Sequence, residues 1–266
     1  MKRFLLVLCW VLLTMQSALA DKMLRLATTT STYNSGLLDY LLPYFEAEAD
    51  ISVQVISVGT GAALRLGQDG DVDLVMTHAP AAEAAFVEAG HGIDPRGLMY
   101  NDFVLVGPAA DPADLQLADN VQDAFSRIVA SRSVFVSRGD DSGTHIKELA
   151  FWESIGQELS FQGYRSVGQG MGRVLSLADE MEGYALTDRG TWLAMKNRLD
   201  LALVYEGDES LFNPYQVILV NPEHHPHVEI ELAEMLADWL VSVEGQRLID
   251  SFQIEGEQLF FASADQ

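Results

Sequence analysis

Short apolar runs alternate with amphipathic segments along the chain, at lengths typical of strands and helices. The first half predicts strands at 23–27, 51–58, 72–77 and 102–107, with helices at 35–48, 61–67 and 81–89 between them. Pro43 falls inside the first of these helices and is expected to kink or divide it. This β-α-β-α-β order predicts a mainly parallel sheet with helices on both of its faces.

The second half continues the alternation with a different sequence. It predicts strands at 133–137, 184–188, 201–205 and 215–220, and helices at 119–131, 142–155, 171–181, 191–197, 228–241 and 244–251. No internal repeat or low-complexity linker separates the halves, so we expect two α/β lobes joined by crossing segments at 101–107 and 205–215. The predicted division assigns 21–103 and 214–266 to lobe I and 104–213 to lobe II.

The first 20 residues have the layout of a signal peptide rather than of a folded element. Lys2 and Arg3 precede the apolar run 4–13, and Ala18–Ala20 forms an A-x-A cleavage site. A membrane span needs about 20 apolar residues, twice the length of this run. We therefore predict export and cleavage after Ala20. Cleavage removes Cys9, the only cysteine, so the mature chain can hold no disulfide, cysteine nucleophile or thiolate metal site.

Composition and charge restrict the partners. A hydrophobic content of 48% and a charged content of 21% are those of a soluble globular protein. The 39 Asp and Glu outnumber the 16 Lys and Arg, which gives a net charge of −23. A chain this acidic is a poor candidate for binding nucleic acid or an anionic membrane.

Four loops rich in Gly, Ser and Thr stand before helices: 28–32, 59–61, 138–145 and 168–172. Backbone N–H groups at a helix N-terminus are unpaired and carry a partial positive charge, so they bind anions. In an open α/β sheet such loops gather at the carboxyl ends of the strands, where ligands bind. The four loops predict a cleft lined mainly by N–H and O–H donors, with few carboxylates or imidazoles, suited to an oxyanion without a proton.

Arg138 is the only cation within these four loops and is expected to supply the full positive charge of the cleft. A guanidinium presents a fixed fork of donors that can meet two oxygens of one anion. Pairing with Asp140 or Asp141 is the structural alternative, and both roles are compatible because a carboxylate can orient the guanidinium.

Enzyme and metal sites are less well supported. Ser142, His145 and Asp141 contain the residue types of a hydrolase, but the chain has no G-x-S-x-G motif and the three are too close in sequence for triad geometry. The run 223–227, Glu-His-His-Pro-His, resembles a metal site, but Pro226 breaks helical ligand spacing. We interpret it as the polar start of a surface helix. No enzymatic activity, cofactor or resident metal is predicted.

Ten segments together resemble one known family. They are 26–32 (Leu-Ala-Thr-Thr-Thr-Ser-Thr), 35–38, 58–61, 70–73, 78–80, 100–103, 137–145 (Ser-Arg-Gly-Asp-Asp-Ser-Gly-Thr-His), 168–172 (Gly-Gln-Gly-Met-Gly), 187–191 and 212–215. The chain resembles the periplasmic tungstate-binding proteins of ABC transporters, the TupA family, over essentially the whole mature length.

The resemblance implies a type II periplasmic-binding fold, with two α/β lobes, two crossovers and the ligand in the cleft between the lobes. It implies a periplasmic, monomeric protein that delivers tungstate, and in some members molybdate, to a membrane permease with a cytoplasmic ATPase. The family's ligand role maps onto Thr30, Ser31, Thr60, Arg138, Ser142, Gly143, Thr144 and Gly170.

Two alternatives remain open. Phosphate-binding proteins of the same fold carry a similar R-x-D-x-S-G-T stretch, which 138–144 satisfies, but have Asp where His78 stands. Phosphate holds a proton near neutral pH and needs an acceptor, so His78 favours a deprotonated anion, although a neutral His can also accept. A sensor or receptor subunit built on the same fold is the second alternative.

Overall fold

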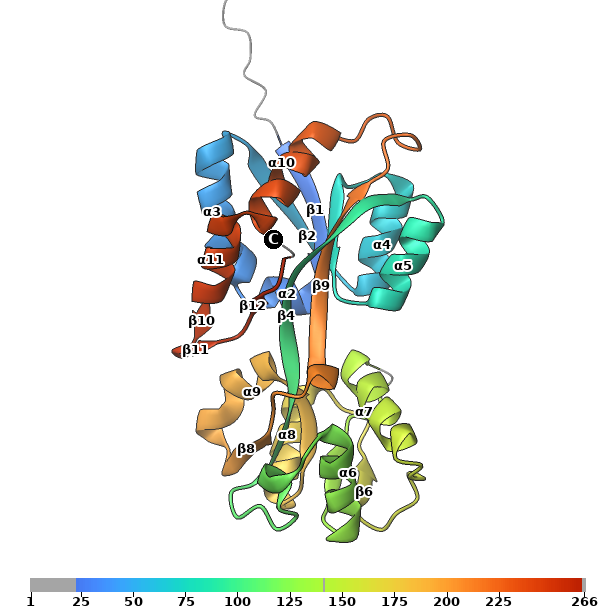
Figure 1. Cartoon of the computed structure of the whole chain (residues 1–266), viewed down its shortest axis with the longest axis vertical. Coiled ribbons are helices and arrows are strands. Elements are labelled where there is room, and N and C mark those ends of the chain that lie inside the picture. Colours follow the sequence, from blue (N-terminus) through green and yellow to red (C-terminus); the bar gives the residue numbers. More distant parts are fainter. Residues whose placement is uncertain (1–22, 141, 265–266) are drawn as a thin grey trace, which may run out of the picture.

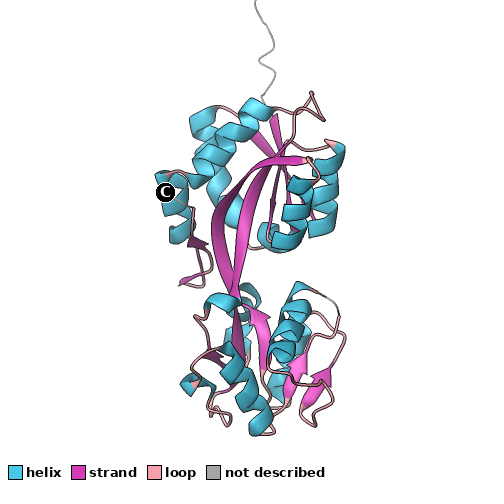
Figure 2. Ribbon diagram, turned by 45° about the vertical axis from the view of Figure 1, so that its right-hand side comes forward, coloured by secondary structure: helices cyan, strands magenta, loops and turns pink. Residues whose placement is uncertain are grey.

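The computed structural model describes residues 23–140 and 142–264, so the predicted signal peptide and Asp141 lie outside the described residues. Figure 1 shows two groups of helices and strands, one above the other, with β4 (Gly92–Pro108) and β9 (Phe212–Val220) running between them. Figure 2 shows the same two long strands from another direction. The predicted α/β architecture with two crossing segments is confirmed.

The sheet of the upper group is mixed, which corrects the prediction of a mainly parallel sheet. Its strands follow the order β12-β4-β9-β3-β1-β2, where β1 is Met23–Thr29, β2 is Ser52–Val58, β3 is Leu74–Thr77 and β12 is Phe261–Ala262. β1 pairs in parallel with β2 and β3, whereas β9 runs antiparallel to both β3 and β4. The reason is that β9 returns from the lower group and inserts between two strands of the upper one.

Helices cover both faces of this sheet, as predicted. One face carries α4 (Thr60–Asp69) and α5 (Pro80–Glu88), and the other carries α3 (Leu37–Ala49), α10 (Ile230–Val241) and α11 (Val243–Ser251). Phe86 of α5 packs with Val75 and Ile218 on the first face. Phe45 of α3 packs against Trp239 of α10 on the second.

Pro43 does not divide the helix, because α3 continues through that residue. Pro43 lies on an exposed side of the helix, so the one backbone hydrogen bond that it cannot donate is lost where water can replace it. The break lies earlier, at Gly36, whose φ of 82° separates α3 from the short helix α2 (Thr30–Asn34). The helix therefore begins at Leu37 rather than at Ser35.

The lower group contains β5 (Phe135–Ser137), β6 (Tyr164–Ser166), β7 (Ala185–Asp188) and β8 (Leu201–Tyr205). Its helices are α6 (Val121–Ala130), α7 (Gly143–Ser154), α8 (Met171–Glu180) and α9 (Arg189–Met195). Phe125, Phe135 and Trp152 form the aromatic centre of its core. The sequence did not predict β6, which pairs in parallel with β5, or the short strands β10 (Gln253–Ile254), β11 (Glu257–Gln258) and β12.

β4 connects the two groups because it changes partner along its 17 residues. It pairs with β9 from Gly92 to Asp102, and with β7 and β8 from Phe103 to Pro108. At the change, the Arg189 guanidinium donates to both carboxylate oxygens of buried Asp102, each at 2.6 Å. This forked pair fixes α9 to the middle of β4. None of the helices in the described ranges 23–140 and 142–264 is long and apolar enough to span a membrane.

Candidate functional site

A cavity of about 710 Å³ lies between the two groups, at the predicted position of a ligand cleft. The starts of α2, α4 and α5 line it from one side, and the Arg138 loop and α7 line it from the other. Residues 101, 103 and 212–215 of β4 and β9 complete its lining. The cavity far exceeds the volume of an anion with one central atom and four oxygens, so both walls must approach such a ligand to contact it together.

The cavity brings together five of the eight residues predicted as ligands, and these are Ser31, Thr60, Arg138, Gly143 and Thr144. The other three, Thr30, Ser142 and Gly170, are not among its lining residues. Thr30 is the first residue of α2 and is exposed to solvent. The short α2 therefore presents its second residue to the cavity rather than its first.

Two helices direct uncapped N-termini at the cavity. α4 begins at Thr60 after Gly59, and α5 begins at Pro80 after Ala79, and neither preceding residue makes a side-chain cap hydrogen bond. The N–H groups of Thr60 and Gly61 precede the first backbone hydrogen bond of α4, and the N–H of Ala81 precedes that of α5, where Pro80 has no N–H to offer. The helix dipole adds partial positive charge at both places. A multi-oxygen anion satisfies such groups without any cation.

The start of α7 differs, because Ser142 caps it. The Ser142 hydroxyl accepts from the backbone N–H of His145 at 3.4 Å, while the Ser142 N–H donates to Asp140 at 3.2 Å. Ser142 therefore shapes the loop, whereas the next two residues, Gly143 and Thr144, line the cavity. An N-cap serine commonly has this structural role.

Arg138 is oriented by Asp140, as expected. Its Nε and Nη2 donate to Asp140 Oδ2 at 3.1 and 2.6 Å, and the arginine side chain is 20% exposed. Burial raises the pKa of Asp140, but the hydrogen bonds from Ser142 and Arg138 outweigh that effect and lower it. The carboxylate therefore remains ionised and holds the guanidinium at the edge of the cavity.

Gly170 belongs to a loop that supports the Arg138 loop from behind. The Gln169 N–H donates to the Arg138 carbonyl at 3.2 Å. Gly139 has a φ of +60°, a backbone conformation that favours glycine, and a Cβ there would lie 1.9 Å from Ser166 Oγ. The predicted fourth loop thus positions the third one and lies off the cavity.

His78 lines the cavity and belongs to a chain of hydrogen bonds that ends on the two crossing strands. Asn101 Nδ2 donates to the Tyr215 hydroxyl at 3.2 Å, and Asn213 Nδ2 donates to Asn101 Oδ1 at 2.8 Å. Asn213 Oδ1 is thereby left to accept from His78 Nδ1, at 3.2 Å. With Nδ1 protonated, Nε2 is an acceptor, and the Ser31 hydroxyl lies 3.4 Å from it. Burial lowers the pKa of His78, so the ring is neutral near pH 7.

Glu83 fixes the backbone on both sides of His78. Its Oε1 accepts from the Thr77 hydroxyl and from the Ala79 N–H, both at 2.7 Å. The side chain is almost fully buried, and Oε2 has no partner among the described residues. Burial raises the pKa of Glu83 more than these hydrogen bonds lower it. Glu83 is thus a positioning residue for the His78 wall.

The prediction that Arg138 alone supplies positive charge is wrong, because Lys147 also lines the cavity. Lys147 lies within α7 and outside the four loops, so a search for cations in loops did not reach it. The one sequence signal for Lys147 is its spacing of three residues from Thr144, which places both residues on the same face of a helix.

The cavity agrees with the expectation that few carboxylates or imidazoles enter the cleft, because its described lining residues include one carboxylate, that of Asp188, and one imidazole, that of His78. Asp188 already accepts from the Thr191 N–H and hydroxyl, both at 2.7 Å, as the N-cap of α9. Its oxygens are therefore partly neutralised by donors of its own helix.

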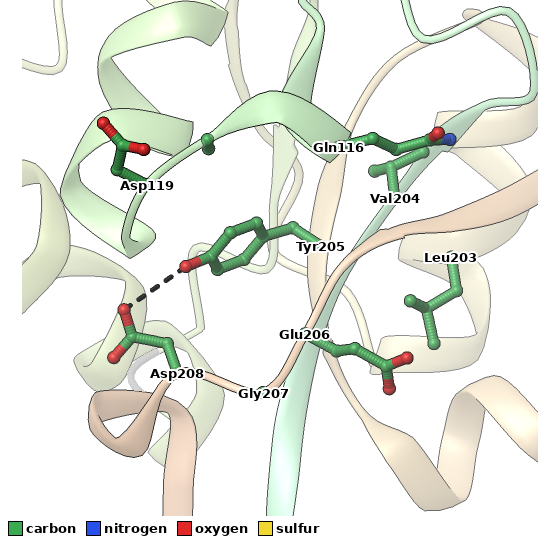
Figure 3. Close-up of a pocket in the computed structure, with 9 residues that line it drawn as sticks. Gln116, Asp119, Leu203, Val204, Tyr205, Glu206, Gly207 and Asp208 are labelled. Atoms are coloured by element: carbon green, nitrogen blue, oxygen red, sulfur yellow. Dashed lines mark hydrogen bonds between the residues drawn. The ribbon is translucent and has the colours of Figure 1, made fainter.

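A second depression of about 500 Å³ lies in the lower group and is unsuited to an anion. Figure 3 shows the carboxylates of Asp119, Glu206 and Asp208 around it, with the Tyr205 hydroxyl donating to Asp208 at 3.3 Å. Burial and the Asp208 charge raise the pKa of Tyr205 to about 12. Three carboxylates repel an anion at this surface.

The histidines of 223–227 pair with the end of α4. His225 Nε2 and His227 Nε2 each lie 2.9 Å from a backbone carbonyl oxygen, of Gln68 and Gly70 respectively. No group of three or more potential ligands in the described part of the chain is arranged to hold a metal ion. Asp141, the third residue of the hydrolase alternative, lies outside that part.

Comparison with known proteins gives concordant matches. The model of the PBP superfamily domain matches residues 17–244. The tungstate-binding protein TupA of Peptoclostridium acidaminophilum is 47% identical over 243 residues, which are 90% of this chain and 85% of that protein. Two solved structures, each covered completely, are also similar. The tungstate-binding protein TupA of Desulfovibrio alaskensis G20 is 45% identical over 92% of this chain, with a TM-score of 0.88. The tungstate ABC transporter structure from Geobacter sulfurreducens is 46% identical over 88%, with a TM-score of 0.74.

Proposed function

Because the chain belongs to the TupA family within the PBP superfamily, we propose that it binds tungstate in the cavity between its two groups of elements and delivers it to the permease of an ABC transporter. Tungstate is then a transported ligand, and the chain needs no cofactor and catalyses no reaction. Molybdate, which has the same shape and charge, is the closest competitor.

One observation carries the proposal. The described residues that line the cavity combine the uncapped starts of α4 and α5 with Arg138, Gly143 and Thr144 on the opposite wall. Backbone N–H groups, hydroxyls and a forked guanidinium suit a tetrahedral oxyanion that has lost its protons. We propose Ser31, Thr60, Arg138, Gly143 and Thr144 as ligands, with Ser142 and Gly170 in supporting positions and Thr30 reaching the anion only if α2 rotates.

We further propose a periplasmic monomer, cleaved after Ala20, with lobe I at 21–103 and 214–266 and lobe II at 104–213. The change of partner of β4 between Asp102 and Phe103 supports the first boundary. The start of β9 at Phe212 supports the second. Intact-mass measurement on periplasmic material tests the cleavage, since a mass that includes residues 1–20 contradicts it.

The experiment that tests the function is titration calorimetry of the apo protein with tungstate, molybdate, sulfate and phosphate. We expect tight binding of tungstate, weaker or equal binding of molybdate, and little binding of sulfate or phosphate. Preference for phosphate would mean that the natural ligand is a protonated anion rather than tungstate. His78 Nε2 would then be the group that accepts a hydrogen bond from the phosphate proton. Absence of binding to all four anions would refute an oxyanion-binding function.

A further inference from the structure

One face of α7 lines the cavity over two helical turns. Gly143, Thr144, Lys147 and Ala150 all belong to the lining. Residues three and four apart in a helix lie on the same face, so Lys147 stands one turn beyond Thr144 along the same wall. Lys147 is half-buried on this face, and its long, flexible stem allows the ammonium to change position along the helix.

Lys147 differs from Arg138 in its charge balance. Arg138 pairs with Asp140 at 2.6 Å, so much of its charge is already compensated. Lys147 forms no ion pair within 23–140 and 142–264. Its Nζ lies 5.7 Å from the ring centroid of Phe151, a residue 5% exposed. Such a cation–π contact is weaker than contact with an anion.

We infer that Lys147 is a second cationic ligand of the bound anion, which leaves Phe151 and contacts the anion when the cavity is filled. The inference rests on the proposed function. A tungstate dianion placed beside the Arg138–Asp140 pair leaves net negative charge on this wall, and Lys147 is the remaining cation among the described lining residues.

The environment of Lys147 is consistent with this role. Burial lowers the pKa of the Lys147 ammonium, and the Asp208 carboxylate, which acts on it from outside the cavity, partly opposes the shift. The other charged or titratable groups among the described lining residues are Arg138, Asp188, His78 and Tyr215. An anion arriving beside Lys147 stabilises its charged form, and a flexible ammonium can approach the anion where the fixed fork of Arg138 cannot.

The test compares three variants with the wild-type chain. Lys147→Gln removes the charge, and Lys147→Arg retains it. Lys196→Gln is the matched control, because it changes the net charge equally but lies in a 3-10 turn away from the cavity, where Lys196 pairs with Glu257. Circular dichroism and thermal melts verify folding. Calorimetry at low and high salt gives the tungstate affinity of each variant.

We expect Lys147→Gln to weaken tungstate binding about 3- to 30-fold, a loss between that of an exposed ion pair and that of a hydrogen bond to a charged group. The loss should be larger at low salt, where charges are less screened. Lys147→Arg should retain affinity within about threefold, and Lys196→Gln should match wild type. Equal affinity of Lys147→Gln and wild type would overturn the inference and leave the proposed function intact. Equal losses in Lys147→Gln and Lys196→Gln would also overturn it, because net charge would then be the cause. A wild-type chain that binds no tungstate would refute the proposed function, and the inference with it.

Discussion

Among the described residues that line the cavity, those of α2, α4 and α5 include no cation, whereas the Arg138 loop and α7 contribute Arg138 and Lys147. The first wall offers dipoles: two uncapped helix starts, the hydroxyls of Ser31 and Thr60, and a neutral His78. The second wall offers full charges held by a carboxylate and a capped helix.

This difference shows why the ligand must contact both walls. Fixed N–H dipoles act only at contact distance, and the first wall alone carries no charge to attract an anion from solution. The second wall carries the charge, but Asp140 compensates part of it. A dianion therefore gains its full set of partners only between the walls, which explains a site shared by two groups of elements.

Arg138→Ala removes the guanidinium from the second wall and should have the largest effect on tungstate binding. Loss of a charged hydrogen-bonding group in a desolvated site should weaken tungstate binding about 10- to 1000-fold. Arg138→Lys should fall between Ala and wild type, because an ammonium lacks the fork. Calorimetry and a thermal melt on the same variant check this. Unchanged affinity with a lowered melting temperature would show that Arg138 only stabilises the loop.

Tungstate itself tests whether one ligand holds both walls. At 100 times its dissociation constant, a ligand that binds only the folded chain adds about 2.7 kcal/mol to the free energy of unfolding. We expect a clear rise in melting temperature with tungstate and almost none with sulfate at equal concentration. Equal rises with both anions would indicate general salt stabilisation in place of a specific site.

Glu83→Ala removes the carboxylate that holds the backbone on both sides of His78 in the first wall. It leaves the buried Thr77 hydroxyl and the Ala79 N–H without their acceptor, which should cost about 1–3 kcal/mol of stability and weaken tungstate binding by displacing His78. Glu83→Gln keeps an acceptor and should retain affinity. Urea unfolding and calorimetry of both variants measure the two effects.

The pH dependence of stability separates these variants further. The pKa of Glu83 is raised above its ordinary value of 4.5, so the folded chain keeps the proton where the unfolded chain has lost it. The contribution of Glu83 to the free energy of unfolding therefore decreases as pH rises above 4.5. Glu83→Gln should remove this decrease, and an unchanged pH profile would contradict the assignment.

Ser142→Ala should have the smallest effect on tungstate binding, and it tests whether Ser142 in the second wall stabilises α7 rather than contacts the anion. Loss of an N-cap hydroxyl costs about 1 kcal/mol of stability. Because Ser142 lies off the cavity lining, tungstate affinity should fall less than about 10-fold, well below the effect of Arg138→Ala. A melt combined with calorimetry decides, and a loss as large as that of Arg138→Ala would make Ser142 a ligand.

The elements of the fold were largely predictable, because apolar periodicity is a local signal. The mixed sheet was not, since the pairing of β3 with β9 joins residues far apart in sequence. The first half of β4 was also missed. Pro95 and Gly97 are unfavourable in strands, and here they lie at irregularities of the register with β9.

The site was predictable where loop chemistry defines it and unpredictable where orientation does. Arg138, Gly143 and Thr144 stand in a loop and helix start whose donors indicate an anion. Lys147 depends on which face α7 turns to the cavity, and Thr30 depends on the rotation of α2, which no residue type reveals. His78 was noted in the sequence, but its link to the crossing strands through Asn213 required the structure.

The insertion of β9 also dictates when the upper sheet can be completed during synthesis. Thr77 pairs with Gln216, so the outer edges of β3 and the first half of β4 lack their neighbour until most of the chain has emerged. Unpaired edges of this kind promote intermolecular association. A chain truncated before Phe212 would retain α2 to α5 yet leave β3 and β4 exposed, and should be recovered as aggregate rather than as a folded half.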